Sequence, residues 1–193
     1  MPNHCENTLT VSGLDLEDFM RSIIKIGDDG KVEIDILQTH FPCPQELIDT
    51  PSGSFNDKEV HAHNLENYGA ENWYDWCIKN WSTKWGDYDG EFISDNMLRF
   101  QSAWAPPVAG FDVVSKKFPA LEFTLEYYEG GMGFYGRAYY HNGLVDDICM
   151  DIEEWICPKC ESKNVSIANF YDSELELECL DCQHSFMEEV VNV

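Results

Sequence analysis

Residues 106–152 read PPVAGFDVVSKKFPALEFTLEYYEGGMGFYGRAYYHNGLVDDICMDI and decide the fold class. The two prolines suit the start of a helix, and apolar residues then recur at helical spacing at Val108, Phe111, Val114 and Phe118. Three segments with strand character follow, over 121–128, 133–140 and 144–152. Asn142-Gly143 favours a tight hairpin turn between the last two. The stretch therefore predicts one helix followed by three antiparallel strands.

The sequence before this stretch predicts a similar alternation. Six segments have a strand or a helix period, namely strands at 5–12, 32–38, 91–94 and 97–104 and helices at 16–24 and 73–81. Residues 41–69 show no strong period, so we interpret them as a long loop or insertion. Helices mixed with an antiparallel sheet favour an α+β two-layer sandwich over a doubly wound parallel sheet. We detect no internal repeat.

The charge of the chain is strongly unbalanced. Its 193 residues include 36 acidic and 12 basic side chains, for a formal net charge of −24. This balance disfavours attraction to nucleic-acid phosphates or to anionic lipid. Aromatic residues make up 13% of the chain, which indicates a folded globule, because disordered acidic chains lack aromatic side chains. The sequence has neither an apolar run of membrane-spanning length nor a signal-peptide pattern, so we expect a cytoplasmic protein.

The eight cysteines of a cytoplasmic chain are expected to be thiols or metal ligands and not disulfides. Cys157, Cys160, Cys179 and Cys182 form two C-x₂-C pairs separated by 18 residues, a spacing typical of a four-thiolate zinc site. His184 is an alternative to Cys182 as fourth ligand, and the second pair disfavours a thioredoxin-type redox motif. We predict one structural Zn²⁺ in a zinc ribbon over 153–193, beside a main domain over 1–152.

Other groups of residues admit a plainer interpretation. The His61-x-His63 pair beside Glu59 is expected to be an ordinary surface pair and not a ligand pair, since no third ligand is evident. The glycines at 130–136 indicate turns, because a phosphate loop would need a following helix. The tryptophans are expected to pack in the core, with an aromatic pocket for a cation or a base as the alternative: Trp73, Trp76, Trp81, Trp85 and Trp104. The remaining cysteines are expected to be buried thiols: Cys5, Cys43, Cys77 and Cys149.

Five strings occur together in a fixed order: MPNHCENTLTVSG at the N-terminus, NWSTKW at 80–85, SAWAPP at 102–107, FPALEF at 118–123 and YYEGGMGFYG at 127–136. In these strings the chain resembles the YubB-type ferredoxin-like proteins of phages, plasmids and genomic islands. The resemblance spans roughly residues 1–150 and implies a ferredoxin-like α+β domain. The resemblance implies no catalytic residues. It also implies a mobile genetic element, and so the cytosol of the host cell if a phage encodes the protein.

The leading functional hypothesis is a non-enzymatic interaction protein that binds a host or defence protein. The acidic charge, the closed metal site and the lack of a recognisable catalytic motif favour it. One alternative is a DNA mimic that inhibits a nuclease or another DNA-binding protein, although the carboxylates do not form regular rows. Another is an enzyme with a pocket in the main domain. Direct nucleic-acid binding is disfavoured by the scarcity of basic residues, and the sequence does not identify a small-molecule ligand.

Overall fold

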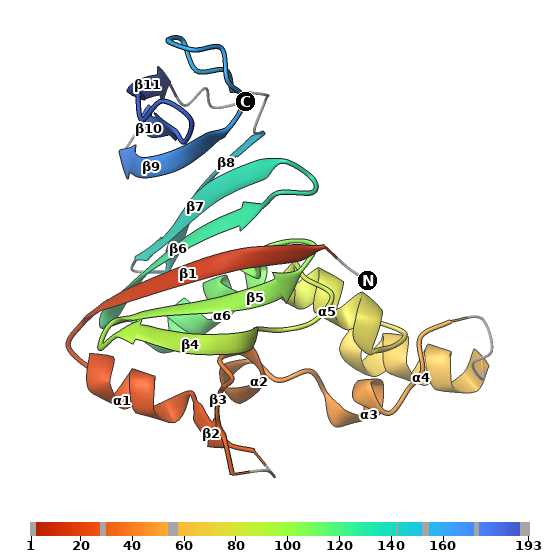
Figure 1. Ribbon diagram of the computed structural model, residues 1–193. Helices are drawn as coiled ribbons and strands as arrows, with labels where there is room; N and C mark the ends of the chain where they lie inside the picture. The colour runs from red at the N-terminus through yellow and green to blue at the C-terminus, as the bar shows by residue number, and fades with distance from the viewer. Residues whose placement is uncertain are drawn as a thin grey trace.

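The computed structural model describes residues 3–27, 30–53, 58–141, 143–151, 155–171 and 174–189 (Figure 1). Its largest element is a six-stranded sheet with the order β4-β5-β1-β6-β7-β8, in which every neighbouring pair is antiparallel. The strands of this sheet are β1 (His4–Gly13), β4 (Tyr88–Ser94), β5 (Met97–Ala103), β6 (Leu121–Glu129), β7 (Phe134–His141) and β8 (Leu144–Asp151). The α+β prediction is confirmed.

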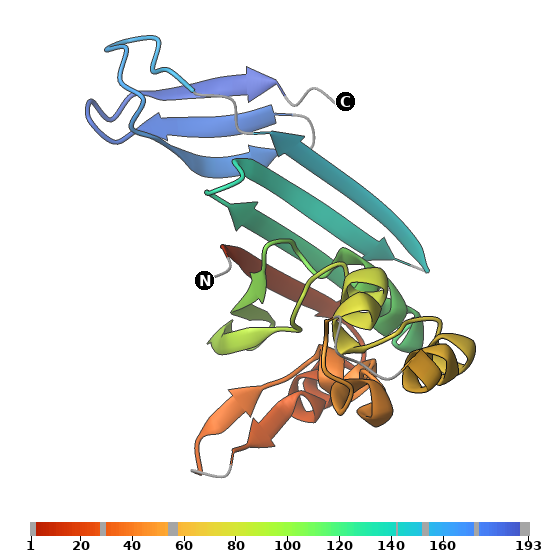
Figure 2. The same cartoon turned by 90° about the vertical axis from the view of Figure 1, so that its right-hand side faces the viewer.

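Four of these strands and two helices have the ferredoxin-like order. The chain runs from β1 through α5 (Trp73–Trp81) to β4 and β5, and then through α6 (Val108–Lys117) to β6. In space the four strands lie in the order β6-β1-β5-β4, which is the split βαβ arrangement. α5 and α6 contact each other and cover one face of the sheet, while β7 and β8 extend the sheet beyond β6 (Figures 1 and 2).

The predicted helix at 16–24 and strand at 32–38 are both too long. α1 (Leu16–Ser22) ends early, and Ile24 begins a short hairpin formed by β2 (Ile24–Ile26) and β3 (Val32–Ile34). The amide of Asp35 donates to the carbonyl of Ile23 at 2.9 Å, and α2 (Leu37–His40) follows the hairpin. Both segments carry apolar residues at spacings that suit either structure, so the periodicity alone misplaced their ends.

Of the two interpretations of 41–69, a long loop or an insertion, the long loop is wrong. The segment contains α3 (Gln45–Ile48) and α4 (Lys58–Tyr68). α4 buries only Asn64 among its described residues, so it has no apolar stripe for a period to show. The Asn64 amide instead donates to Thr50 Oγ1 at 3.1 Å and to the carbonyl of Glu71 at 2.9 Å. Polar contacts of this kind cannot be recognised in a sequence.

The main core lies between the sheet and the helices. Large side chains with no more than 1% exposure fill it, including Leu9, Phe19, Phe100, Phe111, Phe123 and Tyr140. Trp76 and Trp81 belong to this core, as expected, whereas Trp85 and Trp104 remain 39% and 38% exposed. Cys5, Cys43 and Cys77 are buried thiols, but the prediction is wrong for Cys149, which is exposed on the edge strand β8.

Two further expectations concern the turns and the helices. Gly143 has φ +75°, as a tight turn between β7 and β8 requires, whereas Asn142 lies outside the described residues. The predicted boundary between 152 and 153 also falls outside them. No helix in the described part of the chain is long and apolar enough to cross a membrane.

Gly136 is needed because Tyr127 lies against it. The two residues are cross-strand partners, and a Cβ atom at 136 would come within 2.2 Å of the Tyr127 ring and hydroxyl. We expect Gly136→Ala to lower the free energy of unfolding by about 2 kcal/mol or more, because the ring has to move. Gly86→Ala is the control, since its Cβ would make ordinary contacts with Trp81 at 3.4 Å and with Leu37 at 3.7 Å. Equal stability of the two variants in urea titrations would contradict the prediction.

Asp87 ties the segment between β1 and α5 to the sheet. It directly precedes β4, and its carboxylate accepts the amide hydrogens of Ile36 at 2.7 Å and Leu37 at 2.9 Å, at the start of α2. Burial raises the pKa of Asp87 to about 6, although these hydrogen bonds act in the opposite direction.

The raised pKa of Asp87 makes folding depend on pH. The unfolded chain loses this proton near pH 4, whereas the folded protein holds it to about pH 6. The stabilisation that the protonated Asp87 contributes to the folded state is therefore complete below about pH 4 and is lost as the pH rises through 6, with a total change of about 3 kcal/mol. Unfolding free energies of the wild type and of Asp87→Asn, measured from pH 4 to 7, isolate this effect. A difference between the two proteins that stays constant with pH would contradict it.

Candidate metal centre

The C-terminal part of the chain forms a separate three-stranded antiparallel sheet with the order β11-β10-β9. Its strands are β9 (Val165–Tyr171), β10 (Glu174–Cys179) and β11 (Ser185–Glu189). β9 and β10 lie between the two cysteine pairs in the sequence and pair antiparallel with each other. β11 was not predicted, because Ser185–Glu189 is short and follows the second pair directly.

The two C-x₂-C pairs have the same backbone conformation. The amide of the first cysteine donates to the carbonyl five residues later, from Cys157 to Ser162 at 2.8 Å and from Cys179 to His184 at 3.0 Å. The residue four positions after each first cysteine donates back to it, and both of these residues are left-handed: Glu161 with φ 58° and Gln183 with φ 56°. The two turns thus repeat the same backbone structure, although apart from the cysteines their residues differ.

The four sulfur atoms converge on one point. All four lie within 4.8 Å of one another, with Cys157 Sγ at 3.6 Å from Cys182 Sγ and Cys160 Sγ at 3.5 Å from Cys179 Sγ. A tetrahedral site with metal–sulfur bonds of about 2.3 Å has sulfur atoms about 3.8 Å apart. The cysteine cluster therefore fits a metal ion such as zinc, and the fourth candidate ligand is Cys182 and not His184. The His184 ring is stacked on Phe186.

Backbone amides donate hydrogen bonds to the cysteine sulfur atoms and so favour negative charge on them. Burial acts to raise the pKa of Cys157, but the amides of Lys159 and Cys160 donate to its sulfur and lower the pKa to about 7. The amide of Ser162 donates to Cys160 and that of His184 to Cys182, although burial and the neighbouring thiols of the cluster leave the pKa of both cysteines raised. Amide donors of this kind stabilise thiolates, which are the form that binds a metal.

Asp181 holds the two turns together. Its carboxylate accepts hydrogen bonds from Ser162 Oγ at 2.5 Å and from Asn164 Nδ2 at 2.8 Å, and these bonds lower its pKa. The amide of Leu180 donates to the carbonyl of Asn164 at 2.8 Å. The sequence did not predict these hydrogen bonds, since Asp181 lies within the second cysteine pair and its partners follow the first cysteine pair.

The three-stranded sheet packs on the large sheet through a second core. Tyr135 on β7 is buried with Leu175 and Leu177 on β10, and these three contact Met150, Trp155, Val165, Ile167 and Phe186. Tyr135 and Tyr140 point to opposite faces of β7, and Tyr140 belongs to the main core. The three-stranded sheet therefore contacts the face that α5 and α6 leave open, at the end near β7 and β8 (Figure 2).

The other candidate ligands lie apart. His61 and His63 are on α4, where His61 Nδ1 pairs with Glu71 at 3.0 Å and His63 Nε2 with Glu46 at 3.5 Å. Across the described ranges, the four cysteines are the only group of three or more potential ligands that could hold one ion. The glycine run forms the turn between β6 and β7, where the Glu129 carboxylate accepts the amide of Gly131 at 2.9 Å.

The fold and the cysteine cluster define an α+β protein with a ferredoxin-like sheet and a candidate four-thiolate centre. Residues 80–170 match the family model described as a ferredoxin-like domain in Api92-like protein. The chain is similar to a solved structure, the crystal structure of a protein api92 from Yersinia pseudotuberculosis, with 12% identity, 78% of this chain and 98% of that chain covered, and a TM-score of 0.46. No curated protein matches the chain. The family match confirms the ferredoxin-like expectation, while the YubB relation and the mobile-element origin stay predictions.

Removing one ligand should abolish metal binding. We expect Cys157→Ser and Cys179→Ser to lose the bound zinc and the order of the three-stranded sheet, because a layer this small has too little core to fold alone. Zinc analysis of the purified proteins measures the first effect, and amide hydrogen exchange at β10 measures the second. Cys149→Ser is the matched control, since this thiol is exposed and outside the cluster. Full zinc content in both ligand variants would refute the site.

Proposed function

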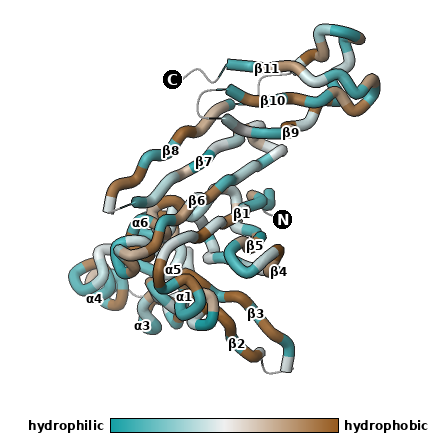
Figure 3. Tube along the Cα trace, turned by 90° about the vertical axis from the view of Figure 1, so that its left-hand side faces the viewer, coloured by the Kyte–Doolittle hydropathy of each residue, from teal (hydrophilic) through white to brown (hydrophobic). Residues whose placement is uncertain are grey.

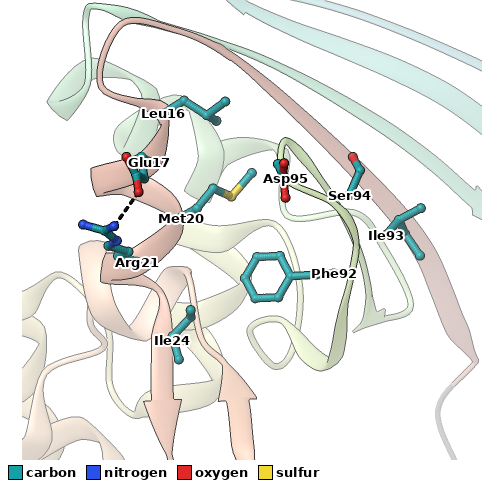
Figure 4. A pocket seen from close by; sticks show the side chains of 9 residues that line it. All are labelled: Leu16, Glu17, Met20, Arg21, Ile24, Phe92, Ile93, Ser94 and Asp95. Carbon is teal, nitrogen blue, oxygen red and sulfur yellow. Dashed lines mark hydrogen bonds and ion pairs between the residues drawn. The ribbon is translucent and has the colours of Figure 1, made fainter.

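We propose that the protein is a non-enzymatic interaction protein that binds another protein in an apolar groove with charged groups at its rim. The groove lies between α1 and the turn from β4 to β5 and has a volume of about 590 Å³ (Figure 4). Leu16, Met20, Ile24, Phe92 and Ile93 supply its apolar lining. This groove is the observation that carries the proposal.

The groove continues into further exposed apolar surface. Ile24, Phe92 and Ile93 are each exposed by 39% or more, and the neighbouring hairpin residues Ile26 and Val32 are exposed by 77% and 64%. The β2–β3 hairpin is among the most hydrophobic parts of the trace, although it projects from the body of the protein (Figure 3). Contiguous apolar surface of this kind is typical of protein–protein contact sites, since water penalises its exposure.

The charges around the groove indicate the chemistry of the partner. Glu17 forms an ion pair with Arg21 at the rim, and Asp95 lies on the opposite wall. The whole chain carries a net charge of −24. A segment with apolar side chains flanked by lysine or arginine fits both features, because the negative field speeds its approach and the groove buries its apolar groups.

Two groups of the main domain with a raised pKa, Asp87 and Tyr127, are engaged in structural contacts, which supports a non-enzymatic role. Asp87 caps α2, and Tyr127 donates to Asp147 at 2.7 Å while packing on Gly136. In this proposal the cysteine cluster holds one structural Zn²⁺, which folds the C-terminal layer and leaves no open position for a substrate. The resemblance to YubB-type proteins of mobile elements supports a host or defence protein as the partner.

Substitutions in the groove should abolish capture of the partner. We expect Phe92→Asp to reduce the amount of a captured protein at least about tenfold in pull-downs from bacterial lysate, because a carboxylate cannot enter an apolar contact without a large desolvation cost. Leu144→Asp is the matched control, since Leu144 is 72% exposed on β8, the edge strand opposite β4. Circular dichroism checks that both variants fold.

The salt dependence of capture separates this proposal from DNA mimicry. Capture through the groove should persist at high salt, because apolar contacts are not screened. Capture of a DNA-binding protein or nuclease that is lost at high salt and is unchanged by Phe92→Asp would overturn the proposal in favour of mimicry.

A further inference from the structure

A second cavity, of about 300 Å³, lies between α5 and the segment that follows β3, away from the groove and from the cysteine cluster. Its lining includes three tryptophans, Trp73, Trp81 and Trp85, together with Ile48 and Cys77. Lys84 is the one charged residue in this lining. The cavity is therefore aromatic, with a single cation.

The Lys84 ammonium is held by aromatic faces and not by a carboxylate. Its Nζ lies 4.7 Å from the centre of the Trp85 ring, 4.8 Å from that of Trp104 and 5.9 Å from that of Tyr74. Within the described residues it has neither a carboxylate at salt-bridge distance nor a hydrogen-bond acceptor. Other cations of this acidic chain do pair with carboxylates, for example Lys116 with Asp112 at 2.7 Å. Lys84, which lines the cavity, thus has no carboxylate among the described residues that competes for its ammonium group.

Strained backbone fixes this arrangement. Ser82 and Trp104 have φ of 66° and 70°, in the left-handed region that a bulky side chain disfavours by about 1–3 kcal/mol. Thr83 holds the two segments together, since its Oγ1 donates to the carbonyl of Ala103 at 2.8 Å and accepts the Ala103 amide at 3.1 Å. The Trp104 amide donates to the carbonyl of Asn3 at 3.0 Å. Strained backbone of this kind persists only where the surrounding structure enforces it, and it is found most often at functional sites.

We propose that this cavity binds a small planar aromatic anion, with its ring among the indoles and its carboxylate on the Lys84 ammonium. Indole walls favour a flat aromatic ring, and the volume accommodates one or two fused rings. An ammonium with free donors forms its strongest hydrogen bonds with an anionic oxygen. The overall negative charge of the chain repels an anion at long range, so the affinity has to come from these short-range contacts.

The test uses two ligands of the same shape, 2-naphthoate and its neutral amide 2-naphthamide, titrated into the zinc-loaded full-length protein by calorimetry. We expect naphthoate to bind at least about tenfold more tightly than naphthamide, as one charge-assisted hydrogen bond predicts. Lys84→Gln should remove this preference and leave naphthamide binding unchanged, whereas Lys84→Arg should preserve it. Shifts of the Trp73 and Trp85 indole N–H signals in NMR spectra locate the ligand.

The controls separate the cavity from general charge effects. Lys116→Gln removes an equal charge at a lysine outside the cavity lining and should leave both affinities unchanged. Trp85→Leu should weaken both ligands, because it removes an aromatic wall. The inference is overturned if the wild type binds neither ligand, if it binds both equally, or if Lys84→Gln and Lys116→Gln have the same effect. None of these results depends on the groove between α1 and β4.

Discussion

The rest of the structure depends on the position of β1 between β5 and β6. β1 pairs antiparallel with both neighbours, and Leu9 lies opposite Leu98 on one side and Leu125 on the other. The side chains that β1 sends toward the helices are fully buried, including Asn7, whose amide donates to Cys5 and to Ser102 Oγ at 2.9 Å. Because both neighbours come from far along the chain, these pairings are non-local contacts, and they bring the segments that carry α5 and α6 to the same sheet.

The two faces of the large sheet are covered by different means. α5 and α6 cover one face with an ordinary apolar core, whereas the other face is contacted near β7 by the layer that carries the four clustered cysteines. Tyr135 and Tyr140, five positions apart on β7, serve the two cores separately. A metal ion can thus stabilise one end of the sheet without approaching the groove or the aromatic cavity.

The acidic composition has different consequences at the two proposed surfaces. At the groove the negative field favours a basic partner, and the apolar lining supplies contacts that salt does not weaken. At the aromatic cavity the same negative field repels an anion, so the positive charge of Lys84 has to offset it locally. The rings of Trp85 and Trp104 hold the Lys84 ammonium by cation–π contacts, which leave its charge intact. The placement of a few side chains, rather than net charge, therefore distinguishes the two surfaces.

The sequence by itself determined the features that depend on local spacing. Strong periods predicted β1, α5, α6 and the strands after them, and the paired cysteines predicted a four-sulfur cluster, because each signal lies within one short segment. Only the tertiary structure decided the helices in 41–69, the hydrogen bonds of Asp181, the packing of Leu175 on Tyr135 and the placement of Lys84 between two tryptophans. These features join residues from distant segments through polar or aromatic contacts, which leave no period in the sequence.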